Sequence, residues 1–274
     1  MAPPAAVRTK NERIESRDNR WLKRFRAALE SSPEKDAAQI GVEGPRLVAE
    51  ALRSGLGLEA ILVSDSGERH LARMGERIPP AVKVLRTSDR LFASVSGTET
   101  PQGVAALVQP PHWGMPDLLA APALAVALAG VQDPGNVGTI VRAAEAFGAS
   151  GLFACFGSAH PFGAKAVRAS AGSVFRLPTL AGSPPADVQS ELRGRNIRQF
   201  AAVVSDAPSP LETDLTLPCA LWIGSEGSGL PEEIRRDSDA QIRIPLRASV
   251  DSLNAATAAS VLLYEAARQR GRLG

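Results

Sequence analysis

The chain has 274 residues, of which 44% are hydrophobic and 22% charged, and its formal net charge at pH 7 is only +2. This length and composition predict a globular protein with one large domain or two ordinary ones. The longest apolar stretch, near residues 118–131, is interrupted by Pro122 and is shorter than the roughly 20 residues of a membrane-spanning helix. The charged N-terminus has no signal-peptide core, so we expect a soluble cytoplasmic protein.

The two cysteines, Cys155 and Cys219, each lie in an apolar stretch, and neither has a Cys or His nearby at the spacing of metal ligands. We therefore expect buried, reduced thiols, which are typical of a reducing cytosol. A zinc site needs several such ligands close together, and we expect no metal.

The first 30 residues are basic, with eight Lys and Arg side chains against four acidic ones. We expect a basic N-terminal arm over residues 1–30. Such an arm either attracts a phosphate backbone or serves as a solubilising tail, and the composition alone fits both functions.

Residues 31–108 predict a small α/β domain. Apolar runs of strand length alternate with segments of helical periodicity, which is typical of parallel sheets with crossover helices. Pro45 begins the first helix, at a position where its missing N–H costs little. The expected strands are residues 39–42, 59–64, 82–86 and 103–108.

Residues 109–122 contain four prolines and one glycine, which stop both helices and strands, and predict a linker. The alternation of strands and helices resumes beyond it, so residues 123–274 predict a second, larger α/β domain. The expected strands are residues 124–131, 151–156, 175–180, 197–204, 219–223 and 241–245. The expected helices are one that ends at Phe147, others near 164–171 and 187–193, a short one from Pro231, and a long one over about 252–269.

Three glycine-rich or polar junctions follow strands of the second domain. The first, residues 129–142, leads through a tight turn into a helix whose N-terminus offers unpaired N–H groups to an anion. Two purely local roles are also open here: Asn136 as the N-cap of the helix, and Arg142 as the partner of Glu145 one turn on.

The second junction, residues 221–231, places three glycines after a short hydrophobic strand. Their spacing is G-x-x-G-x-G and they occur late in the chain, which disfavours a classical dinucleotide-binding fold. Glu226 inside the loop argues against phosphate binding, since a carboxylate repels a polyanion but suits a sulfonium cation or a ribose hydroxyl.

The third junction, residues 244–254, is a strand ended by Pro245, a polar loop and the start of a long apolar helix. Taken alone, Ser252 is interpreted as the N-cap of that helix rather than as a catalytic residue.

Together and in this order, the three junctions closely resemble the signature motifs of the SpoU, or TrmH-like, family of RNA ribose methyltransferases in the SPOUT superfamily. They read NVGTIVRAAEAFG, IGSEGSGL and IPLRASVDSLNAATA, and the intervening KAVRASAGSVFRLP is similar as well. Residues 38–108 more weakly resemble the N-terminal substrate-binding domain of that family, which is related to a ribosomal RNA-binding protein. One departure is Ala255-Ala256, where relatives commonly have valine and serine.

The resemblance implies a C-terminal domain with a parallel sheet and a deep trefoil knot, a bound S-adenosylmethionine, and a site completed across a homodimer. The implied cofactor-binding residues are Gly224, Ser225, Gly229, Ile244 and Leu253. The implied catalytic residues are Asn136, Arg142, Glu226, Ser252 and Asn254. Arg168 is either a contact to RNA or a structural surface arginine.

The implied function is S-adenosylmethionine-dependent methylation of a ribose 2'-hydroxyl in structured RNA, with ribosomal RNA favoured over transfer RNA by the N-terminal domain. We expect Arg142 to hold a phosphate and stabilise the developing alkoxide, because arginine stays protonated up to about pH 12 and is a poor general base. The alternatives are a non-catalytic RNA-binding protein with a vestigial pocket, a nucleotide-binding enzyme such as a dehydrogenase, and a base methyltransferase, against which the NxGxxxR element argues.

Overall fold

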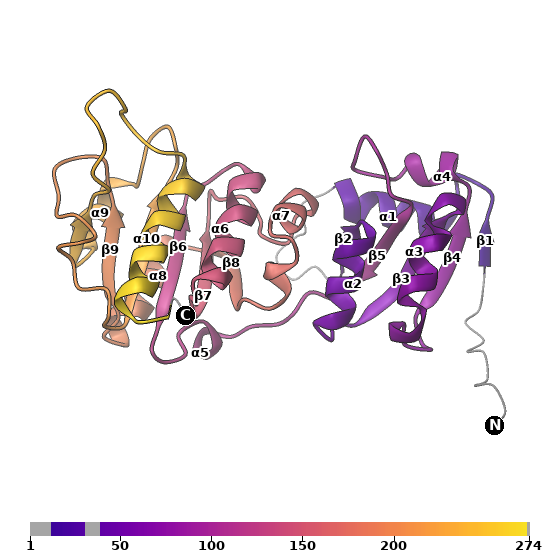
Figure 1. The fold of residues 1–274 in the computed structure, drawn as a ribbon, viewed down its shortest axis with the longest axis horizontal. Helices are drawn as coiled ribbons and strands as arrows, with labels where there is room; N and C mark the ends of the chain where they lie inside the picture. Colours follow the sequence, from indigo (N-terminus) through magenta and orange to yellow (C-terminus); the bar gives the residue numbers. More distant parts are fainter. Residues whose placement is uncertain (1–11, 31–38, 273–274) are drawn as a thin grey trace. The chain divides into compact units, whose positions relative to one another are not determined.

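The computed structural model describes residues 12–30 and 39–272 and divides into two compact units near residue 111 (Figure 1). A short segment, residues 162–164, groups with the first unit. Each unit has its own sheet and its own hydrophobic core. In the described part of the chain, no helix is both long and apolar enough to cross a membrane.

The first unit contains a mixed five-stranded sheet in the order β1-β4-β3-β5-β2. Strand β5 runs antiparallel to both β3 and β2, which differs from the parallel pairing that the alternation indicated. Hydrophobic periodicity identifies strands without fixing their direction. The strands are β1 (Glu12–Ile14), β2 (Ile40–Glu43), β3 (Leu58–Ser64), β4 (Lys83–Thr87) and β5 (Val104–Val108). The helices are α1 (Arg20–Glu30), α2 (Pro45–Arg53), α3 (Glu68–Met74) and α4 (Asp89–Ala93).

Residues 12–30 are part of the first unit and do not form the expected free arm, whose residues 1–11 lie outside the described residues. Strand β1 pairs in parallel with β4. Helix α1 buries an apolar stripe in the first core, and its basic residues lie between the members of that stripe. The buried residues of the stripe are Trp21, Leu22, Phe25 and Leu29.

The second unit contains a six-stranded sheet in the order β11-β9-β10-β6-β7-β8, and every pairing is parallel. This confirms the parallel α/β architecture expected for the C-terminal part of the chain. The strands are β6 (Leu124–Ala129), β7 (Gly151–Cys155), β8 (Thr179–Ser183), β9 (Arg198–Ala202), β10 (Cys219–Gly224) and β11 (Ala240–Ile242). The helices are α5 (Met115–Leu118), α6 (Pro134–Ala146), α7 (Ala164–Ala169), α8 (Pro185–Gly194), α9 (Glu232–Asp237) and α10 (Ala255–Gln269).

Two segments of the second unit differ from expectation. Residues 173–175 form a short 3-10 turn, so the strand expected over 175–180 begins only at Thr179. The proline-rich segment 109–122 contains α5, and its Trp113 and Met115 pack against the second core, because apolar side chains stand between the prolines. The deep trefoil knot stays a prediction.

Strands β6 and β10 lie side by side at the centre of the second sheet, in register from Cys219 opposite Leu124 to Gly224 opposite Ala129. From β6 the sheet continues through β7 and β8 on one side, and through β10, β9 and β11 on the other. The strand order therefore reverses between β6 and β10. Ligands of open parallel sheets bind at such a point, outside the carboxyl ends of the strands.

Arg270 fixes the C-terminal end of α10 to the segments at the amino ends of β6 and β10. Its side chain donates to the backbone carbonyls of Leu215 at 2.8 Å, Ala123 at 3.0 Å, Leu217 at 2.6 Å and Pro122 at 3.2 Å. These carbonyls lie just before β6 and β10. Because α10 begins at the third junction, this clamp also helps to set where the helix starts.

We expect Arg270→Ala to lower the free energy of unfolding by about 2 kcal/mol, because a charged donor to several carbonyls is lost. Urea unfolding followed by circular dichroism measures the effect. Arg195→Ala is the matched control, since the exposed Arg195 side chain makes a long ion pair with Glu191 at 3.5 Å and no other within the described residues. We expect its change to stay below about 0.5 kcal/mol. Equal effects of the two variants would show that Arg270 is no clamp.

Candidate functional site

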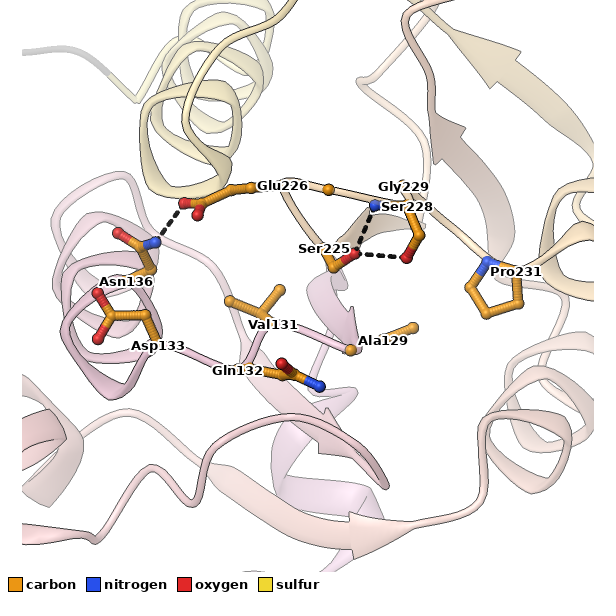
Figure 2. Close-up of a pocket in the computed structure, with 12 residues that line it drawn as sticks. Ala129, Val131, Gln132, Asp133, Asn136, Ser225, Glu226, Ser228, Gly229 and Pro231 are labelled. Carbon is orange, nitrogen blue, oxygen red and sulfur yellow. Dashed lines mark hydrogen bonds between the residues drawn. The ribbon is translucent and has the colours of Figure 1, made fainter.

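A cavity of about 520 Å³ opens at the carboxyl ends of β6 and β10 (Figure 2). Two loops form its walls. The first joins β6 to α6, and with the ends of those elements it lines the cavity from Ala129 to Asn136; the second runs from Ser225 to Pro231. Its volume lies in the range of about 300–1,000 Å³ that is typical of small-molecule sites.

The first loop is anchored at both ends. The Ser158 hydroxyl accepts hydrogen bonds from the backbone N–H groups of Gly130 at 3.0 Å and Val131 at 3.2 Å. At the other end, Asp133 caps α6 by accepting from the N–H of Gly135 at 2.9 Å. The cap role open to Asn136 is therefore wrong, because Asp133 followed by a proline at the first helical position occupies it.

Asp133 also makes an ion pair with Lys165 of α7, with Nζ and Oδ1 2.8 Å apart. The hydrogen bond from Lys165, followed by that from the backbone of Gly135, holds the pKa of the Asp133 carboxyl below its usual value. Sequence reasoning missed Asp133 as a residue that lines the cavity, and it missed Lys165 as the partner of Asp133. The Asp-Pro pair at a strand end was the available signal for Asp133, whereas nothing in the sequence paired it with Lys165.

The second loop folds back on itself. Ser225 and Gly229 exchange backbone hydrogen bonds of 3.2 and 3.0 Å, and the hydroxyls of Ser225 and Ser228 lie 2.7 Å apart. Gly229 has a φ of +68°, which favours glycine, and a Cβ on Gly224 would collide with the backbone of Gly229. Two of the glycines are thus required by the turn itself, and Glu226 is left exposed at its tip.

Glu226 joins the three junctions. Its Oε1 accepts hydrogen bonds from the side-chain amides of Asn136 and, at 2.6 Å, Asn254. The Asn254 amide also donates to Oδ1 of Asn136 at 3.2 Å. Figure 2 shows the carboxylate of Glu226 extending across the cavity edge toward Asn136. Three predicted site residues, each from a different junction, are therefore in direct contact.

Asn254 is also the N-cap of α10. Its Oδ1 accepts from the backbone N–H groups of Ala256 at 2.9 Å and Thr257 at 3.3 Å. Because the cap engages the oxygen, the amide nitrogen is directed toward Glu226. The cap expected at Ser252 is therefore wrong: the helix begins at Ala255, and Ser252 is exposed in the preceding loop.

The Arg142 side chain in α6 is exposed, and the pairing with Glu145 is wrong. The Glu145 carboxylate instead accepts two hydrogen bonds from Arg176, of 2.6 and 2.9 Å. Among the described residues, no carboxylate forms an ion pair with Arg142. Its guanidinium is thus available for an anion from outside the chain.

The remaining predicted residues divide between the cavity and its surroundings. Ser225 and Gly229 line it, and Gly224 lies directly behind the loop. Six other predicted residues do not line the cavity: Arg142, Arg168, Ile244, Ser252, Leu253 and Asn254.

The cavity suits a neutral or cationic ligand with hydroxyl groups. Three of the residues that line it are glycines, Gly130, Gly227 and Gly229, and they permit close approach of a flat or extended group. The Glu226 carboxylate adds a negative charge to the cavity wall, and a carboxylate accepts hydrogen bonds from hydroxyls and attracts cations. A nucleoside that carries a sulfonium fits both properties.

The comparisons with known proteins agree with this geometry. The model of the SpoU rRNA Methylase family matches residues 123–264, and that of the MRM3-like substrate binding domain matches residues 33–106. The 23S rRNA (guanosine(2553)-2'-O)-methyltransferase RlmP of Bacillus subtilis is 29% identical over 92% of this chain and 98% of its own length. The 23S rRNA (uridine(2479)-2'-O)-methyltransferase of Streptomyces viridochromogenes is 31% identical, over 94% of this chain and 92% of its own.

Solved structures give the same result. The SpoU methyltransferase AviRb from Streptomyces viridochromogenes, crystallised in complex with the cofactor AdoMet, matches with a TM-score of 0.83 at 28% identity. The match covers 92% of this chain and 98% of that one. The similarity therefore extends over both units.

We expect Asn254→Ala to lower the free energy of unfolding by about 1–2 kcal/mol, because the N-cap of α10 is lost. Asn254→Ser keeps a capping oxygen and should recover most of that loss. Ser252→Ala is the control and should change the unfolding free energy by less than about 0.5 kcal/mol. Thermal unfolding of the three variants checks this order, and a larger effect at Ser252 would place the cap there instead.

Proposed function

The chain belongs to the SpoU rRNA methylase family, and we propose on that basis that it transfers a methyl group from S-adenosylmethionine to a ribose 2'-hydroxyl of ribosomal RNA. The observation that carries the proposal is the contact of Asn136, Glu226 and Asn254 beside one cavity. A vestigial pocket in a mere RNA-binding protein would have no need to keep these three polar side chains in contact.

S-adenosylmethionine supplies an electrophilic methyl group on a sulfonium whose leaving group is a neutral thioether. The task left to the protein concerns the ribose hydroxyl, which is a weak nucleophile unless it is aligned and its developing negative charge is stabilised. Arg142 provides that stabilisation. It holds the adjacent phosphate and offers a permanent positive charge to the developing alkoxide.

Glu226 orients the ribose or the cofactor. Both of its amide hydrogen bonds fall on Oε1, so Oε2 has no hydrogen-bond donor among the described residues. That oxygen accepts from a hydroxyl or faces the sulfonium charge. Asn136 and Asn254 hold the carboxylate in place, and we assign Ser252 to the same task of orientation on the strength of the family motif.

The cofactor cradle is assigned in two parts. Ser225 and Gly229 line the cavity, and Gly224 allows the loop behind it to close, so these three residues fit a cofactor site by geometry. Ile244 and Leu253 belong to the third junction, and their assignment rests on the family motif alone.

The first unit is proposed to select the RNA. Residues 33–106 match a substrate-binding domain, and two relatives that match 92% and 94% of this chain are named for 23S rRNA. Ribosomal RNA is therefore favoured over transfer RNA. We further propose a homodimer that acts in the cytoplasm, with residues 12–108 as the RNA-selecting domain and residues 123–274 as the methyltransferase.

Methyl labelling of total RNA tests the proposal. The purified protein, methyl-labelled S-adenosylmethionine and RNA from a strain that lacks the gene should give label in the large ribosomal RNA, at one nucleotide. The labelled position should resist alkaline cleavage, because a 2'-O-methyl group blocks attack on the phosphodiester. Label in transfer RNA, label on a base, or no incorporation into any RNA would overturn the corresponding part of the proposal.

We expect Arg142→Ala to reduce kcat by about 10²–10³-fold, because transition-state charge stabilisation is lost. The dissociation constant for S-adenosylmethionine, measured by calorimetry, should stay within about twofold of the parent, since Arg142 does not line the cavity. Arg195→Ala, at the exposed residue that follows α8, serves as the control with parent activity. If Arg142→Ala methylates the same RNA substrate as fast as the parent, the assignment is refuted.

A further inference from the structure

The ion pair between Lys165 and Asp133 joins α7 to one of the residues that line the cavity. Asp133 lines the cavity, and both side chains are substantially exposed, Lys165 at 61% and Asp133 at 46%. An exposed pair of this kind stabilises a fold by less than about 1 kcal/mol. Lys165 is also the only lysine in the sequence after Lys83, since every other Lys or Arg position there is arginine. Bracing α6 against α7 is therefore a weak explanation for the pair.

Helices α6 and α7 are in close contact without that ion pair. A Cβ on Gly138 of α6 would collide with the carbonyl of Ala166 in α7. Along α6, Arg142 comes one turn after Gly138, and Glu145 comes two turns after Gly138. The three residues therefore share one side of the helix. Glu145 binds Arg176, just beyond α7. By helical spacing, Arg142 therefore lies on the side of α6 that is next to residues 164–176.

Lys165 and Arg168 share one side of α7, because they are three residues apart. Among the described residues, no carboxylate pairs with Arg142 or Arg168. The Nη1 atom of the half-buried Arg168 side chain is itself buried and has no hydrogen-bond acceptor. Three cations thus lie on the adjoining α6 and α7, and Asp133 is paired with one of them. We call Arg142, Lys165 and Arg168 the α6/α7 basic strip.

We propose that Lys165 is a phosphate-binding residue for the RNA substrate, held at the cavity wall by Asp133 and transferred to a phosphate beside the target ribose when RNA binds. This inference rests on the proposed function. A lysine is suited to the exchange, because its compact ammonium is carried on a flexible stem and has no fixed bidentate geometry. Asp133 remains stabilised after the exchange, since it still caps α6 and faces the positive end of that helix.

Two single substitutions separate this function from a structural brace by the sign of their effects. The probe is unmodified 23S rRNA transcript, titrated by filter binding at several KCl concentrations. Lys165→Gln should weaken binding and reduce the slope of log K against log salt by about 0.7–0.9, the value for one lost phosphate contact. Asp133→Asn keeps an N-cap for α6 and frees Lys165, so RNA binding should become up to about fivefold tighter.

The double variant removes an ambiguity in the second result. Loss of the Asp133 charge alone would favour any phosphate nearby, so Asp133→Asn is repeated in the Lys165→Gln background. The gain should disappear there if it acts through Lys165. Lys165→Arg, which keeps the charge, should restore the parent slope. Arg195→Gln, just after α8, should leave both affinity and slope unchanged.

The outcomes distinguish this inference from the proposed function. If Lys165→Gln and Asp133→Asn both weaken RNA binding, or if the salt slope of Lys165→Gln equals that of the parent, Lys165 is a brace and the inference is wrong. Methyl transfer by the parent protein is measured in the same samples. If the parent binds RNA but transfers no methyl group, the proposed function is refuted. The direction in which Lys165→Gln and Asp133→Asn change RNA binding would still decide whether Lys165 binds phosphate.

Discussion

The carboxylate of Glu226 is the interaction on which the arrangement of the site depends. It accepts from Asn136, 90 residues earlier, and from Asn254, 28 residues later, and so fixes the loop after β10 against the starts of α6 and α10. The adjacency of β6 and β10 makes this possible, because their carboxyl ends emerge side by side. At the far end of α10, Arg270 ties the helix to the segments that enter the same two strands. Hydrogen bonds therefore hold both ends of α10 to segments that adjoin the same two strands, β6 and β10.

The sequence identified the three junctions that meet at the site, but it did not predict which of their residues contact one another. The three junctions were recognised by their order and spacing, and the family match confirms that recognition. Periodicity also placed most strands of the second unit, including β6, β7 and β10, within two residues of their observed ends. What it missed was strand direction in the first unit, since β5 carries the same apolar pattern whether it runs parallel or antiparallel.

Local rules failed where distant residues compete. Glu145 stands three residues from Arg142 but binds Arg176, 31 residues away. Ser252 and Asn254 are both good capping residues, and only the path of the loop decides that Asn254 caps α10. In α1 the basic residues concealed an apolar stripe that includes Trp21 and Phe25. Tertiary context decides these cases, and the proposed roles of Arg142 and Arg168 stay predictions.

The glycines of the second loop have different reasons to lack a side chain. Gly224 is enforced by the backbone of Gly229, and Gly229 by its own left-handed conformation. Gly227 also lines the cavity, yet a Cβ there would have no neighbour within 4 Å. The fold makes no demand on that position, so natural selection for glycine at Gly227 would act through the ligand. Within one short turn, a side chain at Gly224 or Gly229 would therefore harm folding, whereas one at Gly227 would only narrow the cavity.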